Sequence, residues 1–239
     1  MKIFRFIILL LFSTLSIAQE HPADQSTEEK DAPKLLIIGA SYAQNWPIDK
    51  VGCLKVLNQG IDGEVSTQTR GRFKKSLLSA KPQAVLIWGF INDFSNNPQE
   101  MADETRETAI RNIEAMTKAA QNLGVIPILT TEVTMGEPDS LLNSLRNWIG
   151  ELRGKQGFQQ YISSNVMTVN RWIRLYAKQR GFPLLDIEQL MTNEKGNRKL
   201  GYFTSDLSHI SNQAYQDLSA FSLPILEERL IKANRLCSD

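Results

Sequence analysis

Two short apolar segments, each ending at a glycine, restrict the fold more than any other feature of the sequence. Residues 35–38 are four large aliphatic residues followed by Gly39, and residues 84–88 are a second apolar run followed by Gly89. Such runs are typical of strands buried on both faces of a parallel sheet, although a piece of buried helix would show the same pattern. Further strands are expected over residues 53–57, 125–130 and 183–186.

Segments with helical spacing of apolar residues separate these strands. Helices are expected over residues 66–79, 100–123, 141–152 and 162–177, and from Ser211 onward with a kink or break at Pro224. Alternating strands and helices predict an α/β fold, a three-layer α/β/α sandwich around a five-stranded parallel sheet. Pro127 indicates that its strand lies near an edge of the sheet or that the proline is at the strand's start. The active cleft is expected over the carboxyl ends of the first three strands.

The first 18 residues have the features of a secretory signal peptide. Lys2 and Arg5 precede the apolar run 7–12, and small residues end the segment at Ala18. The apolar run is too short to cross a bilayer comfortably. We expect cleavage after Ala18, a periplasmic or secreted protein and no stable membrane insertion, with an uncleaved anchor as the alternative.

The polar segment 19–33 is predicted to be a disordered linker, because from His21 to Asp31 it has no aliphatic residue larger than alanine. Residues 34–239 are then one domain of ordinary size. Removing residues 1–18 removes two of the 27 basic residues and none of the 26 acidic ones, which leaves a net charge of −1. This balance predicts no nucleic acid partner, and nothing in the sequence sets the oligomeric state.

The sequence contains two cysteines, Cys53 and Cys237. After export they would meet an oxidising compartment, where a disulfide between them is plausible. Two buried free thiols are the alternative. Their spacing is not that of a metal site, and we expect no metal.

Ser41 follows the first expected strand, at the end where α/β sheets bind ligands. A nucleophilic serine needs a base, and His209 is the single histidine of the domain because His21 lies in the linker. Asp206 precedes His209 by three residues and could orient its imidazole. The alternative is that Ser41 caps a helix and that Asp206 and His209 are polar loop residues near a helix start.

Acyl chemistry also requires hydrogen-bond donors for the oxyanion of a tetrahedral intermediate. Two loops that end beside Ser41 offer the backbone N–H of Gly63 and the side-chain amide of Asn92. Gly60 is a second candidate for the glycine donor. A turn glycine and a turn or capping asparagine are the simpler interpretations of each residue alone.

Four blocks together resemble the SGNH hydrolases, the family of GDSL-type esterases and lipases. In family order, these blocks are Gly39-Ala40-Ser41, Asn58-Gln59-Gly60-Ile61-Asp62-Gly63, Gly89-Phe90-Ile91-Asn92-Asp93 and Asp206-Leu207-Ser208-His209. The resemblance extends over the domain 34–239 and implies a flavodoxin-like fold.

The resemblance also implies a set of site residues and the absence of a metal or organic cofactor. Ser41 is the implied nucleophile, His209 the base and Asp206 its orienting acid. The implied oxyanion hole is formed by the backbone N–H groups of Ser41 and Gly63 and the side chain of Asn92.

The chain departs from the family pattern at two places. Ala40 stands where the family usually has an aspartate, which removes a carboxylate that could organise the loop. Two residues, Phe90 and Ile91, separate Gly89 from Asn92 where the family usually has one.

These features predict an exported serine esterase that removes a small acyl group, such as an acetyl group, through an acyl-enzyme. Its substrate would be a small-molecule, glycan or lipid ester. The alternatives are a non-catalytic binding module with the same fold and an acyltransferase that acts on an envelope glycan or lipid.

Two further features bear on the substrate. The segment 132–160 is interpreted as an insertion whose amphipathic helix forms a lid or packs in the core. Aromatic residues near the four blocks could line an acyl slot or a sugar platform, but core packing is the commoner explanation; they are Trp46, Trp88, Phe90, Phe94, Tyr202 and Phe203.

Overall fold

The computed structural model describes residues 32–137, 157–194, 196–232 and 236–237. The chain divides into two compact units, Met1–Asp31 and Ala32–Asp239. The predicted signal peptide, nearly all of the predicted linker and the predicted helix over 141–152 lie outside the described residues. Everything below concerns the second unit.

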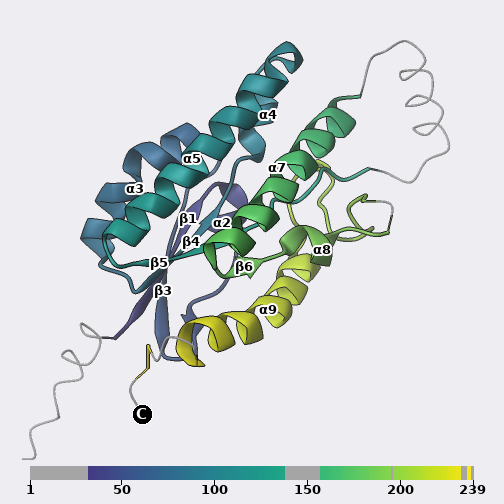
Figure 1. Ribbon diagram of the computed structural model, residues 1–239. Helices are drawn as coiled ribbons and strands as arrows, with labels where there is room; N and C mark the ends of the chain where they lie inside the picture. Colours follow the sequence, from purple (N-terminus) through teal and green to yellow (C-terminus); the bar gives the residue numbers. More distant parts are fainter. Residues whose placement is uncertain (1–31, 138–156, 195, 233–235, 238–239) are drawn as a thin grey trace, which may run out of the picture. The chain divides into compact units, whose positions relative to one another are not determined.

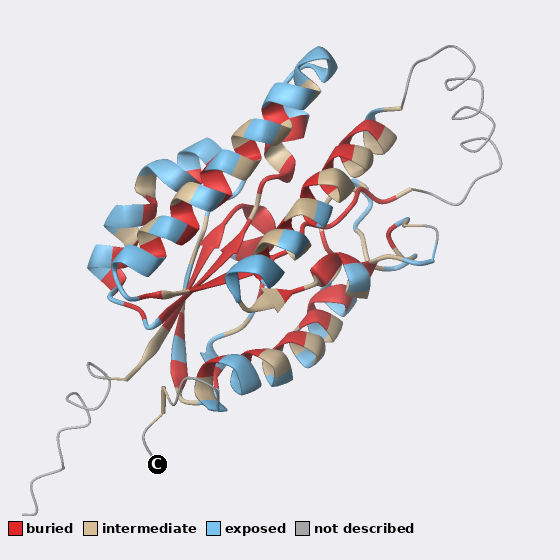
Figure 2. Ribbon diagram, viewed as in Figure 1, coloured by how far each residue is buried: buried red, intermediate tan, exposed pale blue. Residues whose placement is uncertain are grey.

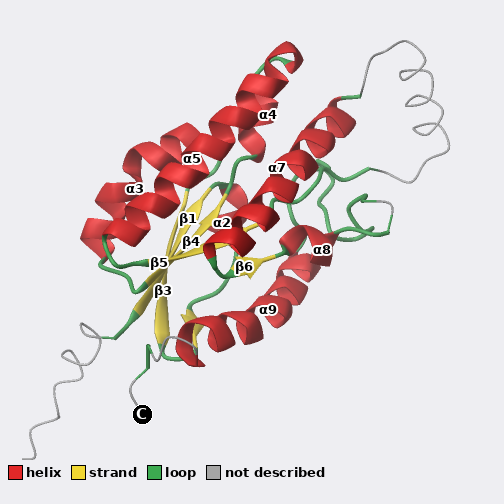
Figure 3. Ribbon diagram, viewed as in Figure 1, coloured by secondary structure: helices red, strands yellow, loops and turns green. Residues whose placement is uncertain are grey.

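A six-stranded sheet in the order β2-β3-β1-β4-β5-β6 forms the centre of this unit (Figure 3). Its strands are β1 (Lys34–Gly39), β2 (Lys50–Val51), β3 (Leu54–Gly60), β4 (Ala84–Trp88), β5 (Ile126–Thr130) and β6 (Leu184–Leu185). All strands except β2 are parallel, which confirms the five predicted. The sixth, β2, pairs antiparallel with β3 at the edge and is too short to carry a hydrophobic period.

Helices cover both faces of the sheet (Figure 1), which confirms the three-layer α/β/α sandwich. The helices are α2 (Ser41–Gln44), α3 (Ser66–Ala80), α4 (Ile91–Asn96), a 3₁₀ turn η1 (Gln99–Met101), α5 (Ala102–Asn122), α7 (Phe158–Arg180), α8 (Ile187–Met191), α9 (Asn212–Leu226) and a π-helical segment η2 (Glu227–Lys232). Helices α3, α5 and α7 pack beside one another. Helix α9 packs against α2, where the Tyr215 hydroxyl donates to the Tyr42 carbonyl at 3.1 Å.

The two glycine-terminated runs of the sequence form the central strands β1 and β4. Leu35, Leu36, Ile37 and Ile38 are fully buried, and every residue of β4 is buried (Figure 2). Burial on both faces explains why residues 35–38 and β4 contain no charged residue; Lys34, at the start of β1, is only partly buried.

Two prolines mark local departures from regular structure. Pro127 lies in β5, next to the edge strand β6, as expected from its missing N–H. The N–H of Leu129 donates to the carbonyl of Pro183, just before β6. The nitrogen of Pro127, two residues earlier, faces the same side of β5, at a level of the sheet where β6 has not yet begun. Of the expected kink or break at Pro224, the break is wrong, because α9 continues through Pro224 to Leu226, where η2 follows.

The segment interpreted as an insertion is partly core. Glu132, Val133 and Thr134 are no more than 1% exposed in a non-regular segment after β5, and residues 158–160 already belong to α7. Residues 132–135 of this segment therefore pack inside the domain, whereas Phe158 is 50% exposed.

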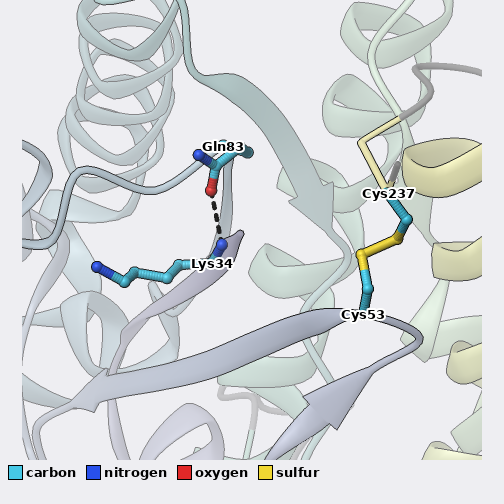
Figure 4. Close-up of a disulfide and its surroundings, with 4 residues drawn as sticks. All are labelled: Lys34, Cys53, Gln83 and Cys237. Carbon is cyan, nitrogen blue, oxygen red and sulfur yellow. Dashed lines mark hydrogen bonds between the residues drawn. A yellow bond between two sulfur atoms is a disulfide. The ribbon is translucent and has the colours of Figure 1, made fainter. Parts of the chain in front are cut away.

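Cys53 and Cys237 form a disulfide with a Cα–Cα distance of 6.0 Å (Figure 4). The alternative of two free thiols is therefore wrong. Cys53 lies at the amino end of β3. The disulfide therefore ties the C-terminal segment to the edge of the sheet that is opposite the carboxyl ends of the strands.

The chain changes direction within the sheet at β1. From β1 it proceeds to β3 on one side and then crosses to β4 on the other. Gly39 at the end of β1 pairs in register with Gly60 of β3 and Trp88 of β4, so the three strands end together. The loops that follow them meet at this switch point, where open α/β sheets bind ligands.

Candidate active site

Ser41 is the first residue of α2 and follows β1 after a single intervening residue. It is 5% exposed. Gly39 has a φ of +154°, and a Cβ on it would lie 1.6 Å from the Trp88 carbonyl oxygen, so the end of β1 requires glycine. The helix N-cap, Ala40, offers no side-chain acceptor, which leaves the first N–H groups of α2 without a capping oxygen.

Asp206 and His209 are in direct contact. The Nδ1 of His209 lies 2.6 Å from Oδ2 of Asp206. The other carboxylate oxygen accepts hydrogen bonds from the backbone N–H groups of Ser208 and His209 at 2.8 and 2.9 Å, and from the Thr204 hydroxyl at 2.7 Å. Burial acts to raise the pKa of Asp206, but the hydrogen bonds from His209, Thr204 and Ser208 outweigh it and hold this pKa below its usual value.

The structure connects Ser41 to the base indirectly. The hydroxyl of the next residue, Tyr42, donates to the Ser208 carbonyl at 2.7 Å, and the rings of Tyr42 and His209 meet edge to face at 6.3 Å. The Ser41 hydroxyl makes no hydrogen bond to any residue that the structure describes. A hydrogen bond between Ser41 and His209 therefore stays a prediction.

The two predicted oxyanion donors lie in adjoining loops. Gly63 is exposed with a φ of +71°, and its N–H has no acceptor among the described residues. Asn92 uses its Nδ2 to donate to the Glu64 carbonyl at 3.1 Å, which joins its loop to that of Gly63. Gly60 is excluded as a donor because its N–H already bonds to Oδ1 of Asn58 at 2.9 Å.

Asp93 fixes the relative position of the same two loops. It is 3% exposed and accepts hydrogen bonds from the Ser66 backbone N–H at 2.8 Å and the Ser66 hydroxyl at 2.6 Å. Burial raises the pKa of Asp93 above its usual value. Its contacts tie the start of α3 to the start of α4.

Arg198 is a buried cation beneath the His209 loop, and sequence reasoning missed it. Its guanidinium donates to the Ser208 carbonyl at 2.6 Å and to the Tyr42 hydroxyl at 3.2 Å, and it is 2% exposed. No local motif surrounds it. Only the folded chain brings it against Tyr42, which is 156 residues away.

Glu132 is a fully buried acid behind the site, and it too was missed. Its carboxylate accepts hydrogen bonds from Trp88 Nε1, the Phe90 N–H and the Val133 N–H at 3.1–3.2 Å. Burial raises its pKa to about 7. The one sequence signal was an acid two residues after the end of a buried strand.

The aromatic residues considered for the substrate are mostly structural. Those most fully buried are each no more than 2% exposed and pack in the core; they are Trp46, Trp88, Phe90 and Phe94. Tyr202 and Phe203 are partly exposed. The described residues contain no group of three side chains that could hold a metal ion, and none of their helices is long and apolar enough to cross a membrane.

A three-layer α/β sandwich with polar loops at its switch point and an Asp–His pair in a neighbouring loop is an arrangement compatible with hydrolytic enzymes. The model of the GDSL-like Lipase/Acylhydrolase family matches residues 39–216. The chain belongs to this family, as its four blocks predicted, and is a carboxylic ester hydrolase.

Solved structures share the fold at low sequence identity. A GDSL-like lipase from Bacteroides thetaiotaomicron has a TM-score of 0.64 and 21% identity, covering 84% of this chain and 91% of that one. A lipase/acylhydrolase from Enterococcus faecalis has a TM-score of 0.58 and 19% identity, covering 82% and 96%. A mutant acetyl-xylooligosaccharide esterase from Geobacillus Stearmophilus has a TM-score of 0.57 and 15% identity, covering 81% and 94%. No curated protein matches the chain.

Proposed function

We propose that the protein is an exported serine esterase in which Ser41, His209 and Asp206 form the catalytic triad. The observation that carries this proposal is the 2.6 Å contact between Asp206 Oδ2 and His209 Nδ1. A carboxylate on Nδ1 holds the proton there and leaves Nε2 as an acceptor for the proton of a serine hydroxyl.

The reaction follows from these assignments. Oγ of Ser41 bonds to the ester carbonyl carbon while its proton passes to Nε2 of His209. The carbonyl oxygen becomes an oxyanion that accepts hydrogen bonds from the N–H groups of Ser41 and Gly63 and from Asn92. The C–O bond to the alcohol then breaks, and His209 returns the proton to the leaving oxygen. Water repeats the sequence on the acyl-enzyme, releases the carboxylic acid and restores Ser41.

Export and a periplasmic or secreted location belong to the proposal. They are supported by the signal-like residues 1–18 and by the disulfide Cys53–Cys237, since disulfides persist in oxidising compartments. The proposed substrate is an ester with a small acyl group, such as an O-acetylated glycan or a lipid ester. The similar fold of an acetyl-xylooligosaccharide esterase supports the glycan class.

The test is hydrolysis of 4-nitrophenyl acetate together with labelling by a fluorophosphonate probe. The wild-type protein should turn over the ester and be labelled, and Ser41→Ala should do neither. Ser95→Ala is the matched control and should behave as wild type, because Ser95 is an exposed serine on α4 whose hydroxyl donates to the Ile91 carbonyl. Full activity or labelling in Ser41→Ala would contradict the proposal.

A further inference from the structure

The side chain of Arg72 turns inward from α3 toward the end of β1, where it reaches the Gly39 carbonyl. Its Nε and Nη2 donate to the two carboxylate oxygens of Glu64 at 2.7 and 2.6 Å. The side chains are 22% and 7% exposed, respectively. This bidentate arrangement fixes the geometry of both groups more strictly than a single contact would.

The pair contacts the segments that carry all three proposed oxyanion donors. Nη2 of Arg72 also donates to the Gly39 carbonyl at 3.3 Å, two residues before Ser41. Glu64 directly follows Gly63. Its backbone carbonyl accepts the hydrogen bond from Nδ2 of Asn92 at 3.1 Å.

The Glu64 carboxylate has a further partner in its buried position. The Thr69 hydroxyl donates to Oε2 at 2.7 Å, so one face of α3 encloses the pair. Removal of Arg72 is costly, because the Glu64 charge would stay buried without its cationic partner. The pair is therefore a rigid element between α3 and the loops after β1 and β3.

The ion pair also holds the loop in which Ala40 replaces the carboxylate usual in the family. Ala40 is buried and offers no hydrogen bond from its side chain, so it cannot hold the loop between β1 and α2. Arg72 reaches the carbonyl of the preceding residue, Gly39, and supplies a polar tether to this loop from another element.

We propose that Glu64 and Arg72 are positioning residues that hold the oxyanion donors of Ser41, Gly63 and Asn92 in their mutual arrangement. The catalytic part of this inference rests on the proposed function. Donors stabilise an oxyanion only when they converge on one point, and a displacement of about 1 Å can cost on the order of 100-fold in rate.

The test compares Arg72→Met with Arg174→Met. Arg174 makes a similar bidentate contact, to Asp186 at 2.7 Å for both bonds, and its side chain is 33% exposed. Its acidic partners, Asp186 and Glu188, lie outside the segments that carry the proposed oxyanion donors. We expect Arg72→Met to lower kcat by about 10- to 100-fold with KM nearly unchanged, and Arg174→Met to keep kcat while its stability falls.

Two further variants keep the test informative if Arg72→Met folds poorly. Arg72→Lys keeps the charge but loses the planar fork, so it should recover part of kcat. Glu64→Gln should lower kcat in the same way as Arg72→Met. Wild-type kcat in folded Arg72→Met, or in both Arg72→Lys and Glu64→Gln, would overturn the inference.

Hydrogen exchange gives a readout that does not depend on activity. Amides of residues 39–45 and 61–66 should exchange faster in Arg72→Met than in wild type, and Arg174→Met should leave them unchanged. If the wild-type protein proves inactive on esters, the proposed function fails and the exchange result alone decides the positioning inference. Equal exchange of both segments in wild type and Arg72→Met would overturn it.

Discussion

The hydroxyl of Tyr42 donates to the carbonyl of Ser208 at 2.7 Å, and this bond joins the helix that begins with Ser41 to the loop that holds His209. The same hydroxyl accepts a hydrogen bond from buried Arg198 at 3.2 Å. The position of the proposed base relative to the proposed nucleophile thus depends on a side chain that itself need not touch the substrate.

Tyr42→Phe should lower both kcat and the free energy of unfolding. Removing the hydroxyl leaves the His209 loop without this tether, so we expect kcat to fall about tenfold with KM little changed, and the free energy of unfolding to fall by about 1–2 kcal/mol. Ester kinetics and urea denaturation measure both. Tyr176→Phe removes a hydroxyl 2.9 Å from Thr117 and away from the site, so it should lose stability only. Equal kcat values in the two variants would contradict the prediction.

Asp206→Asn should abolish most activity while leaving the fold intact. An amide facing Nδ1 of His209 favours the tautomer with the proton on Nε2, which cannot accept the proton of Ser41. We expect kcat to fall by about 10³- to 10⁴-fold. Asp217→Asn is the control. Asp217 lies in α9 and accepts hydrogen bonds from Tyr202 and Gln213. A loss of less than tenfold in Asp206→Asn would argue against the triad assignment.

The parts of the site that the sequence predicted are those encoded by short local patterns. Asp206 and His209 are three residues apart, so a single turn brings them into contact. Ser41 follows a strand whose end was located from its apolar run. The strand before Gly63 was predicted, although β3 continues to Gly60, three residues beyond the predicted end, and parallel pairing brings both strand ends to one edge of the sheet.

The parts that the sequence did not predict depend on contacts between distant segments. Arg198 meets Tyr42 across 156 residues and Glu132 meets Trp88 across 44, and no spacing rule connects either pair. Arg72 illustrates a second limit. Its ion pair with Glu64 is partly buried and turns the charged side chain inward, which the spacing of apolar residues along α3 does not reveal.

Glu132 should make stability depend on pH near neutrality. Burial raises the pKa of Glu132 from 4.5 to about 7, so between these values the folded state binds more protons than the unfolded state. The free energy of unfolding should therefore decrease as pH rises from about 4.5 to about 7, by on the order of 3 kcal/mol, and the loss should be complete above this range. Below about pH 4 the free energy of unfolding should decrease again as pH falls, because groups with a lowered pKa, such as Asp206, become protonated.

The measurement is urea denaturation at pH 4.5 to 8. Glu132→Gln should flatten this slope whatever its absolute stability, because the amide does not titrate. Glu107→Gln replaces an exposed acid of α5 and should retain the wild-type slope. If Glu132→Gln shows the wild-type slope, Glu132 is ionised throughout the range and the assignment of the slope is wrong.

The disulfide should stabilise the domain without affecting chemistry. Cys53 lies at the amino end of β3, and its bond to Cys237 closes a loop with a sequence separation of 184. Replacing both cysteines with serine should lower the free energy of unfolding by about 2–5 kcal/mol, with kcat of the folded protein unchanged. Reductant should reproduce the loss in wild type and have no effect on the double variant. Equal stability with and without reductant in wild type would contradict this prediction.

Asp62 should set a charge preference for the substrate. Its carboxylate is 72% exposed and lies 4.0 Å from Nε2 of His209, so a bound ester would lie close to this negative charge. An anionic acyl group such as that of 4-nitrophenyl hemisuccinate is repelled, whereas the neutral acyl group of 4-nitrophenyl acetate is not. Asp62→Asn should therefore raise kcat/KM for the anionic ester relative to the neutral one by about fivefold, corresponding to roughly 1 kcal/mol between charges in water.

Salt and a second variant separate this effect from a general change in His209. In wild type, added salt should narrow the difference between the two esters, because exposed charges are screened. Asp49→Asn removes the same charge from an exposed position before β2 and should leave the ratio of the two esters unchanged. If Asp62→Asn changes both esters by the same factor, Asp62 acts through His209 and not on the charge of the substrate.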